Sequence, residues 1–371
     1  MNLRRAAHAL QWLMLSGSSV AAAQYVPEPR SLSAGVETRY YSLGPNLAVS
    51  SLGQFAVPLA FVQPAGRFVF DVGTWVASTT LSLHDGFRET VTGITDTQVR
   101  AAYVLGSDAI VLSALVNVPT GAQQLSVTEY AVLAAASSSF FAFPVNAYGS
   151  GASLTLGAAG AFETGEWNLG LAASGRLAGE YQPFTDAEGD FSYQSGLEFR
   201  LRGGADRLVG NGRLALGLTF STFSTDEFAT GGGATGIYKP GKRLIGEVSY
   251  GTLIGDASLT GYVWDFYRLA GDSAGISAGN RENLLATGLV GRWILKPNLF
   301  FEPGAEFRWY APEEGSAIML ELSAAFRVRL SSQWALIPVG RLSFGQLQEP
   351  EPGLAHAIRG GGLSVLLRWS L

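Results

Sequence analysis

The segment Trp167–Ala178, with the sequence WNLGLAASGRLA, alternates between two kinds of side chain along its whole length. The first phase is largely apolar and consists of Trp167, Leu169, Leu171, Ala173 and Leu177. The second phase is small or polar and consists of Asn168, Gly170, Ala172, Ser174 and Arg176. Successive side chains of an extended chain point to opposite sides. A repeat of two residues therefore indicates a β-strand with one apolar face.

The same alternation returns in residues 191–202, 298–310 and 318–330. It also ends the chain, where one phase is largely apolar and the other more polar: Leu363, Val365, Leu367, Trp369 and Leu371 against Ser364, Leu366, Arg368 and Ser370. We interpret this segment as the closing strand of a barrel. It resembles the last strand of bacterial outer-membrane proteins, which their assembly machinery reads, although that strand typically ends on an aromatic residue and this one ends on Leu371.

Short turns and longer loops separate the predicted strands in strict alternation. The longer loops are rich in glycine and acidic residues and cover residues 43–50, 84–93, 119–150, 179–190, 225–242, 270–283, 311–316 and 346–359. Eight such loops and seven short turns give about sixteen antiparallel strands, as in transmembrane barrels with short periplasmic turns and long external loops. Residues 256–268 and 284–293 alternate weakly, and merging a pair of strands would give fourteen.

Composition agrees with an apolar surrounding. Of the 371 residues, 15% are charged and 47% are apolar, whereas soluble domains are about 25% charged. After Gln24 no run of 18 apolar residues occurs, so a transmembrane helix is not expected. We predict an all-β, transmembrane, antiparallel up-and-down barrel in the bacterial outer membrane, with lipid as its partner. A sheet exposed to lipid must close to leave no unpaired edge.

The N-terminus carries an export signal by its pattern. Arg4 and Arg5 precede a short apolar core, and Ala21, Ala22 and Ala23 offer the small residues of a cleavage site before Gln24. We expect residues 1–23 to be a signal peptide and residues 24–371 to form one barrel domain. The chain has no cysteine and three histidines, and no basic face for nucleic acid. We expect no cofactor, metal or catalytic site; His84 and His356 lie in loops without a recognisable motif.

If the apolar phase faces lipid, the opposite phase points into the barrel and is highly charged. We predict that these residues line a pore: Arg39, Arg100, Glu198, Arg200, Arg202, Glu302, Glu306, Arg308, Glu321, Arg327, Arg329, Arg341 and Arg368. A water-filled channel would hydrate such charges, whereas a filled interior would have to pair them. The same residues could instead form ion-pair networks that stiffen the wall.

The third external loop, residues 119–150, is unlike the others. Ser126 and Glu129 fit a capping box ahead of a helix that we expect from about Val127 to Ser139. The continuation holds Phe140, Phe141 and Phe143 and is too apolar to lie in water. We predict that this loop folds inward and narrows the pore, with Tyr130 also in the constriction; an external cap is the alternative.

The segments Tyr25-Val26-Pro27-Glu28-Pro29 and Val116-Asn117-Val118-Pro119-Thr120-Gly121 are similar to outer-membrane transporters of aromatic-compound degradation, such as the phenol meta-pathway, and more distantly to the long-chain fatty-acid transporter family. The resemblance implies a passive channel for small solutes, apolar or aromatic ones included. Few residues precede the first predicted strand, too few for a hatch or plug domain. A structural or adhesive barrel with a plugged lumen is the alternative function, and we expect a monomer.

Overall fold

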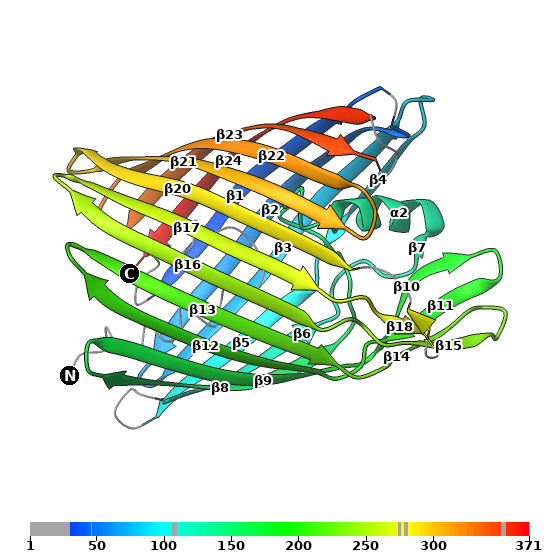
Figure 1. Ribbon diagram of the computed structural model, residues 1–371. Coiled ribbons are helices and arrows are strands. Elements are labelled where there is room, and N and C mark those ends of the chain that lie inside the picture. Colours follow the sequence, from blue (N-terminus) through cyan, green and yellow to red (C-terminus); the bar gives the residue numbers. More distant parts are fainter. Residues whose placement is uncertain are drawn as a thin grey trace.

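The strands form one closed antiparallel barrel (Figure 1). The computed structural model describes residues 30–45, 47–105, 110–273, 276–277, 281–349 and 354–370. The barrel strands are β1 (Ser31–Leu43), β2 (Val49–Ala65), β3 (Phe68–Leu83), β4 (Arg88–Ile94), β5 (Thr97–Leu105), β6 (Ile110–Val118), β8 (Ser153–Thr164), β9 (Trp167–Ala178), β12 (Glu198–Val209), β13 (Gly212–Phe223), β16 (Arg243–Ile254), β17 (Ala257–Arg268), β20 (Glu282–Lys296), β21 (Leu299–Pro312), β22 (Ser316–Arg329), β23 (Trp334–Gln348) and β24 (Ala355–Ser370). The predicted signal peptide and the predicted turn at residues 106–108 lie outside the described residues.

The ring closes where the last strand meets the first. β24 pairs with β1 from Ser31 opposite Ser370 to Leu43 opposite Ile358. Of the seventeen strands in the described sheet, β4 and β5 both pair with β3 and are separated by Thr95 and Asp96. They act as one interrupted strand, so the barrel has sixteen strands rather than fourteen. The weakly alternating segments remain separate as the neighbouring strands β17 and β20.

The two faces of the wall differ as the alternation predicts. Apolar side chains of one phase are exposed on the outside, for example Leu171 at 63%, Leu177 at 59% and Leu363 at 69%. The opposite phase of the same strands carries Arg176, Ser364 and Arg368. An outward apolar band on a closed sheet is the surface that lipid stabilises. Among the described residues, no helix is long and apolar enough to cross a membrane.

A second sheet projects beyond the barrel at the end opposite the termini (Figure 1). It has the order β15-β14-β11-β10-β7, formed by Thr235–Tyr238, Asp226–Ala229, Gly189–Gln194, Glu180–Asp186 and Leu125–Ser126. A further small pair consists of β18 (Asp272–Ser273) and β19 (Ile276–Ser277). The interpretation of residues 179–190 and 225–242 as loops is therefore wrong in part, since cross-strand pairing orders both. The predicted loop 84–93 is likewise shorter, because β4 begins at Arg88.

Residues 191–202, which we predicted as one strand, form two. β11 belongs to the outer sheet and β12 to the barrel, and the strand is interrupted between Gln194 and Glu198. At the break the Gly196 N–H donates to the Asp226 carboxylate (2.7 Å) and the Leu197 N–H donates to Ser224 Oγ (2.7 Å). These side-chain acceptors replace a ladder partner, so alternation continues in the sequence although the strand does not.

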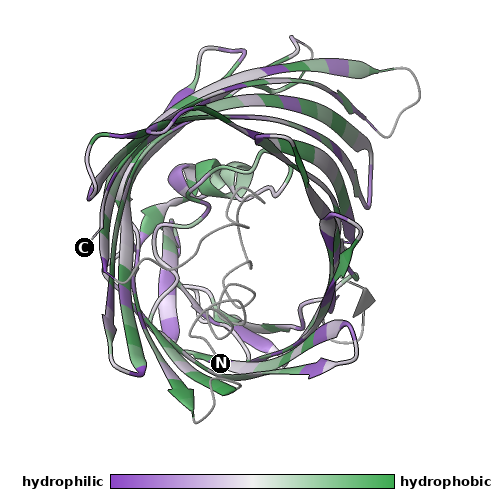
Figure 2. Cartoon of the chain, turned by 90° about the vertical axis from the view of Figure 1, so that its left-hand side faces the viewer, coloured by the Kyte–Doolittle hydropathy of each residue, from purple (hydrophilic) through white to green (hydrophobic). Residues whose placement is uncertain are grey.

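The helix α2 (Val127–Ala136) lies within the ring of strands when the barrel is viewed along its length (Figure 2). It begins at the predicted residue, and both bonds of the capping box are present: Ser126 Oγ accepts from the Glu129 N–H, and the Glu129 carboxylate accepts from the Ser126 N–H. It ends at Ala136 instead of Ser139, because the Ser137 N–H makes the last bond to Leu133.

Candidate functional site in the barrel interior

The third loop packs against the inner wall. From the loop, Val132 is 0%, Phe140 2% and Tyr148 1% exposed, in one apolar cluster with wall residues. The buried wall residues of this cluster are Tyr41, Leu52, Ala56, Ala77, Leu81, Val91, Leu284, Ala317, Met319 and Ile358. They come from strands on both sides of the barrel seam between β24 and β1. The loop thus buries its apolar side inside the barrel, and burial of such side chains is the main stabilising contribution to its position.

Three wall side chains hold the backbone of the loop. Tyr41 Oη donates to the Phe141 carbonyl (2.8 Å), and Arg308 Nη1 donates to the Phe140 carbonyl (3.1 Å). Gln54 Nε2 donates to the Val145 carbonyl (2.6 Å), while Gln54 Oε1 accepts from the Val145 N–H (2.9 Å). Each bond satisfies a backbone group that is buried without a strand partner.

The neck of the loop is clamped at Asp96, in the gap between β4 and β5. Its carboxylate accepts from Gly121 N–H (2.9 Å), Ser150 N–H (2.7 Å), Ser150 Oγ (3.1 Å) and Asn117 Nδ2 (2.8 Å). Gly121 and Ser150 are at opposite ends of the loop. A side chain at Gly121 would collide with the Tyr148 backbone, so the two ends cross closely here. One buried carboxylate, 8% exposed, therefore joins both ends of the loop to the wall.

The predicted constriction residues do not all lie together. Phe140 and Phe143 are buried, and Phe141 and Phe143 contact the Tyr41 ring at centroid distances of 5.0 and 5.4 Å. Ser126 and Glu129 cap the helix. Tyr130, which is 43% exposed, lies apart from these phenylalanines and contacts Phe184 of the outer sheet at 4.8 Å.

Most of the predicted pore-lining charges are paired along the inner face. Three arginines and three glutamates from β1, β21, β22 and β23 form one network: Arg39 with Glu37 (3.2 Å) and Glu321 (3.6 Å), Arg341 with Glu37 (3.3 Å) and Glu321 (3.6 Å), and Arg308 with Glu306 and Glu321. Further pairs are Arg100 with Asp71, Arg200 with Glu198, Arg202 with Glu247, and Arg292 and Arg327 with Glu302. Such pairing supports the stiffening interpretation for these members.

Two predicted residues differ from the rest. Arg329, the last residue of β22, stacks over the Phe300 ring at 5.1 Å. Arg368, 9% exposed, stands on the inner face of the closing strand opposite Ser33. The sequence did not single out Tyr41 or Gln54 as site residues, and it placed Asp96 on the inward face without predicting that it holds the loop. Tyr41 and Gln54 also belong to the inward phase, but nothing in the local pattern marks Gln54 as a partner of residue 145.

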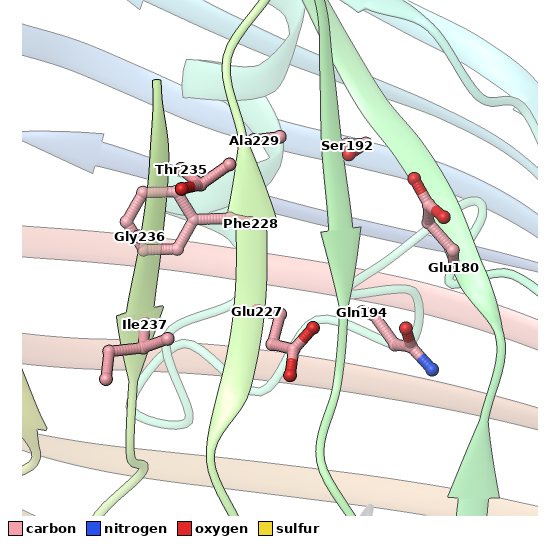
Figure 3. A pocket seen from close by; sticks show the side chains of 9 residues that line it. All are labelled: Glu180, Ser192, Gln194, Glu227, Phe228, Ala229, Thr235, Gly236 and Ile237. Carbon is pink, nitrogen blue, oxygen red and sulfur yellow. The ribbon is translucent and has the colours of Figure 1, made fainter. Parts of the chain in front are cut away.

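An open hollow of about 540 Å³ lies on the outer sheet rather than in the barrel interior. Figure 3 shows the side chains that line it, among them Glu180, Gln194 and Glu227, which face each other across β10, β11 and β14. Its two carboxylates and open shape give it no apolar enclosure. Among the described residues, no group of three or more His, Asp or Glu side chains is arranged to hold a metal ion. His84 Nε2 lies 3.2 Å from the Gly44 carbonyl oxygen, and His356 Nε2 lies 3.2 Å from the Glu349 carboxylate, where the two form an ion pair only when the imidazole is protonated.

The outer sheet should weaken at alkaline pH. Burial raises the pKa of the Tyr181 phenol to about 12, and burial together with the Asp226 carboxylate raises the pKa of Tyr193. A tyrosine with a raised pKa contributes stability that is complete below pH of about 10 and is lost as the pH rises through the folded-state value. We expect amide hydrogen exchange in residues 180–194, corrected for its intrinsic pH dependence, to accelerate above pH of about 10. The variant Y193F should lose part of this pH dependence of exchange. The same exchange profile in Y193F and the unaltered protein would show that ionisation of Tyr193 does not weaken the sheet.

No family profile matches the sequence, and no curated protein matches it. Solved barrel structures do match over nearly the whole chain. A FadL homologue of Pseudomonas aeruginosa has 9% identity and a TM-score of 0.48, covering 94% of this chain and 92% of that one. The Pseudomonas putida toluene transporter TodX has 11% identity and a TM-score of 0.43, covering 96% and 93%. OmpT of Vibrio cholerae has 9% identity and a TM-score of 0.41, covering 91% and 97%. The likeness is one of barrel architecture.

Proposed function

We propose that this protein is a passive channel of the bacterial outer membrane for small solutes, apolar or aromatic ones included, and that residues 119–150 narrow its pore. The observation that carries the proposal is the attachment of the third loop inside the barrel by Tyr41, Gln54 and Arg308. A barrel of sixteen strands is wide enough for an aqueous channel in known examples. A loop held against the inner wall on one side reduces that width without an added domain.

The charges on the inner face support water in the remaining space. Arg200, Arg292 and Arg327 keep about a third of their side-chain surface exposed, at 32%, 34% and 32%. Burying such groups in a dry interior would be costly, even when they are paired. Among the three loop phenylalanines, Phe141 is only partly buried and would offer apolar surface to a solute. A structural barrel with a plugged lumen is the competing function.

Single-channel conductance separates the two functions. The mature chain refolded in a planar bilayer should give a steady conductance, and a variant lacking residues 126–143 should conduct more, by roughly two-fold if the segment occupies about half of the cross-section of such a barrel. A matched control is a variant in which residues 230–234, the turn between β14 and β15 of the outer sheet, are shortened, because this turn does not enter the barrel. If neither the intact chain nor the deletion conducts, the plugged structural barrel is correct.

A further inference from the structure

A row of arginines crosses the inner wall beside the aromatic part of the third loop. Arg200, Ser221, Arg243, Arg268 and Glu282 are direct cross-strand partners on β12, β13, β16, β17 and β20, which are neighbours in the barrel (Figure 1). All five belong to the inward phase of their strands. The row lies at the external ends of these strands, where a solute would enter.

Within this row Arg243 differs from its neighbours. Arg200 is paired with Glu198 at 2.7 Å and Arg268 with Glu282 at 3.1 Å. Over the described part of the chain, Arg243 has no carboxylate within ion-pair distance, and its buried Nε has no hydrogen-bond partner. Its guanidinium stacks over Phe223 at 4.8 Å. Such stacking leaves the edge of the guanidinium free to bind an acceptor.

The row also places like charges together. Arg243 stands directly opposite Arg268, and like charges in that position destabilise a sheet. Its other charged neighbours are Glu198, Arg200 and Glu282, and the two carboxylates, which pair with Arg200 and Arg268, offset part of this repulsion. Three guanidinium groups face two carboxylates here, so an anion bound beside Arg243 would balance the remaining positive charge and accept the fork of donors that arginine presents to a carboxylate.

Apolar surface continues from the row toward the loop. Ile245 and Phe266 form the next inward positions on β16 and β17, and Trp264 follows Phe266 on the same face, opposite Glu247, which pairs with Arg202. Tyr310 donates to Glu282, the partner of Arg268, and its ring contacts Phe140 at 5.8 Å. Guanidinium groups and aromatic rings therefore adjoin each other along one strip of the wall.

We propose that this strip, Arg200, Arg243 and Arg268 together with Phe266, Trp264 and Tyr310, binds small organic anions that carry a carboxylate on an aromatic ring. The inference deepens the proposed channel function and rests on it. The carboxylate occupies the guanidinium groups around Arg243, and the ring lies on the aromatic side chains. A neutral aromatic solute lacks the first contact, and a small aliphatic acid lacks the second.

Calorimetric titration of the refolded, detergent-solubilised chain tests the strip with three probes: benzoate, benzyl alcohol and acetate. We expect benzoate to bind at least tenfold more tightly than either of the others. Benzyl alcohol lacks the carboxylate that contacts the guanidinium groups, and acetate lacks the ring that contacts the aromatic side chains. The variant R243Q should weaken benzoate binding about tenfold, the effect of losing one hydrogen-bonded charge. R243K keeps the charge without the planar fork of donors, so its affinity for benzoate should lie between those of R243Q and the unaltered protein.

The matched control is R213Q. Arg213 also carries its charge on the inner face but lies at the opposite end of the barrel, paired with Asp206 at 2.8 Å. The R213Q variant should bind benzoate with the same affinity as the unaltered protein. Equal binding of benzoate and benzyl alcohol, or equal affinity of R243Q, R243K and the unaltered protein, would overturn the inference. Conductance of the same preparation separates the two claims: an open channel that does not bind benzoate refutes the strip alone, and a closed barrel refutes the channel.

Discussion

The variant D96N should release the third loop while leaving the barrel folded. The Asp96 carboxylate accepts four hydrogen bonds, from Asn117, Gly121 and Ser150. An amide of the same size presents its NH₂ group to some of those donors, so at least one bond is lost and a donor is left facing a donor. Hydrogen bonds to a charged group are worth about 1.5–3 kcal/mol each. Losing the equivalent of about 3 kcal/mol would raise the population of the detached loop roughly 100-fold.

Two measurements report the detached loop. Chymotrypsin should cleave D96N within residues 126–148, which contain several aromatic residues and no lysine or arginine, faster than it cleaves the unaltered protein. The channel current of D96N should also fluctuate more. The matched control is D71N, which removes a carboxylate paired with Arg100 on the adjoining strand, outside the loop. Cleavage of both variants at the same rate would show that Asp96 does not hold the loop.

Much of the barrel could be predicted because its information is local. Alternation in Trp167–Ala178 predicted both ends of β9, because successive side chains of a strand face lipid and lumen in turn whatever their distant partners are. The capping box at Ser126 and Glu129 is equally local, and it located the start of α2. Leu363 to Trp369 predicted the closing strand, which the pairing of β24 with β1 confirms.

The parts that could not be predicted depend on contacts between residues far apart in the sequence. Gln54 and Val145, or Arg308 and Phe140, meet because the loop turns into the barrel, and no spacing in the sequence encodes that meeting. The outer sheet was missed for a related reason. Its strands are short, such as Asp226–Ala229, and their order comes from pairing with one another. The split of residues 191–202 likewise depends on Asp226, a distant acceptor.

Removal of Arg308 should destabilise the protein strongly. Its side chain is 6% exposed, pairs with Glu306 and Glu321, and donates to the Phe140 carbonyl. R308Q would leave buried carboxylates short of a counter-charge, and breaking one partner of a buried pair costs about 3–5 kcal/mol. Urea unfolding of the refolded barrel, followed by tryptophan fluorescence, should show a midpoint that falls by the corresponding amount at unchanged slope.

Two further variants separate the charge effect from general damage to the wall. R292Q removes an arginine that also pairs on the inner face but whose side chain is 34% exposed and whose partner Glu302 retains Arg327. Water screens that pair, so we expect a loss below about 1 kcal/mol. The double variant E306Q/R308Q removes both charges and should be more stable than R308Q, because Glu321 keeps Arg39 and Arg341 as partners. If the double variant is as unstable as the sum of its single changes, the network stabilises the loop through packing and not through charge.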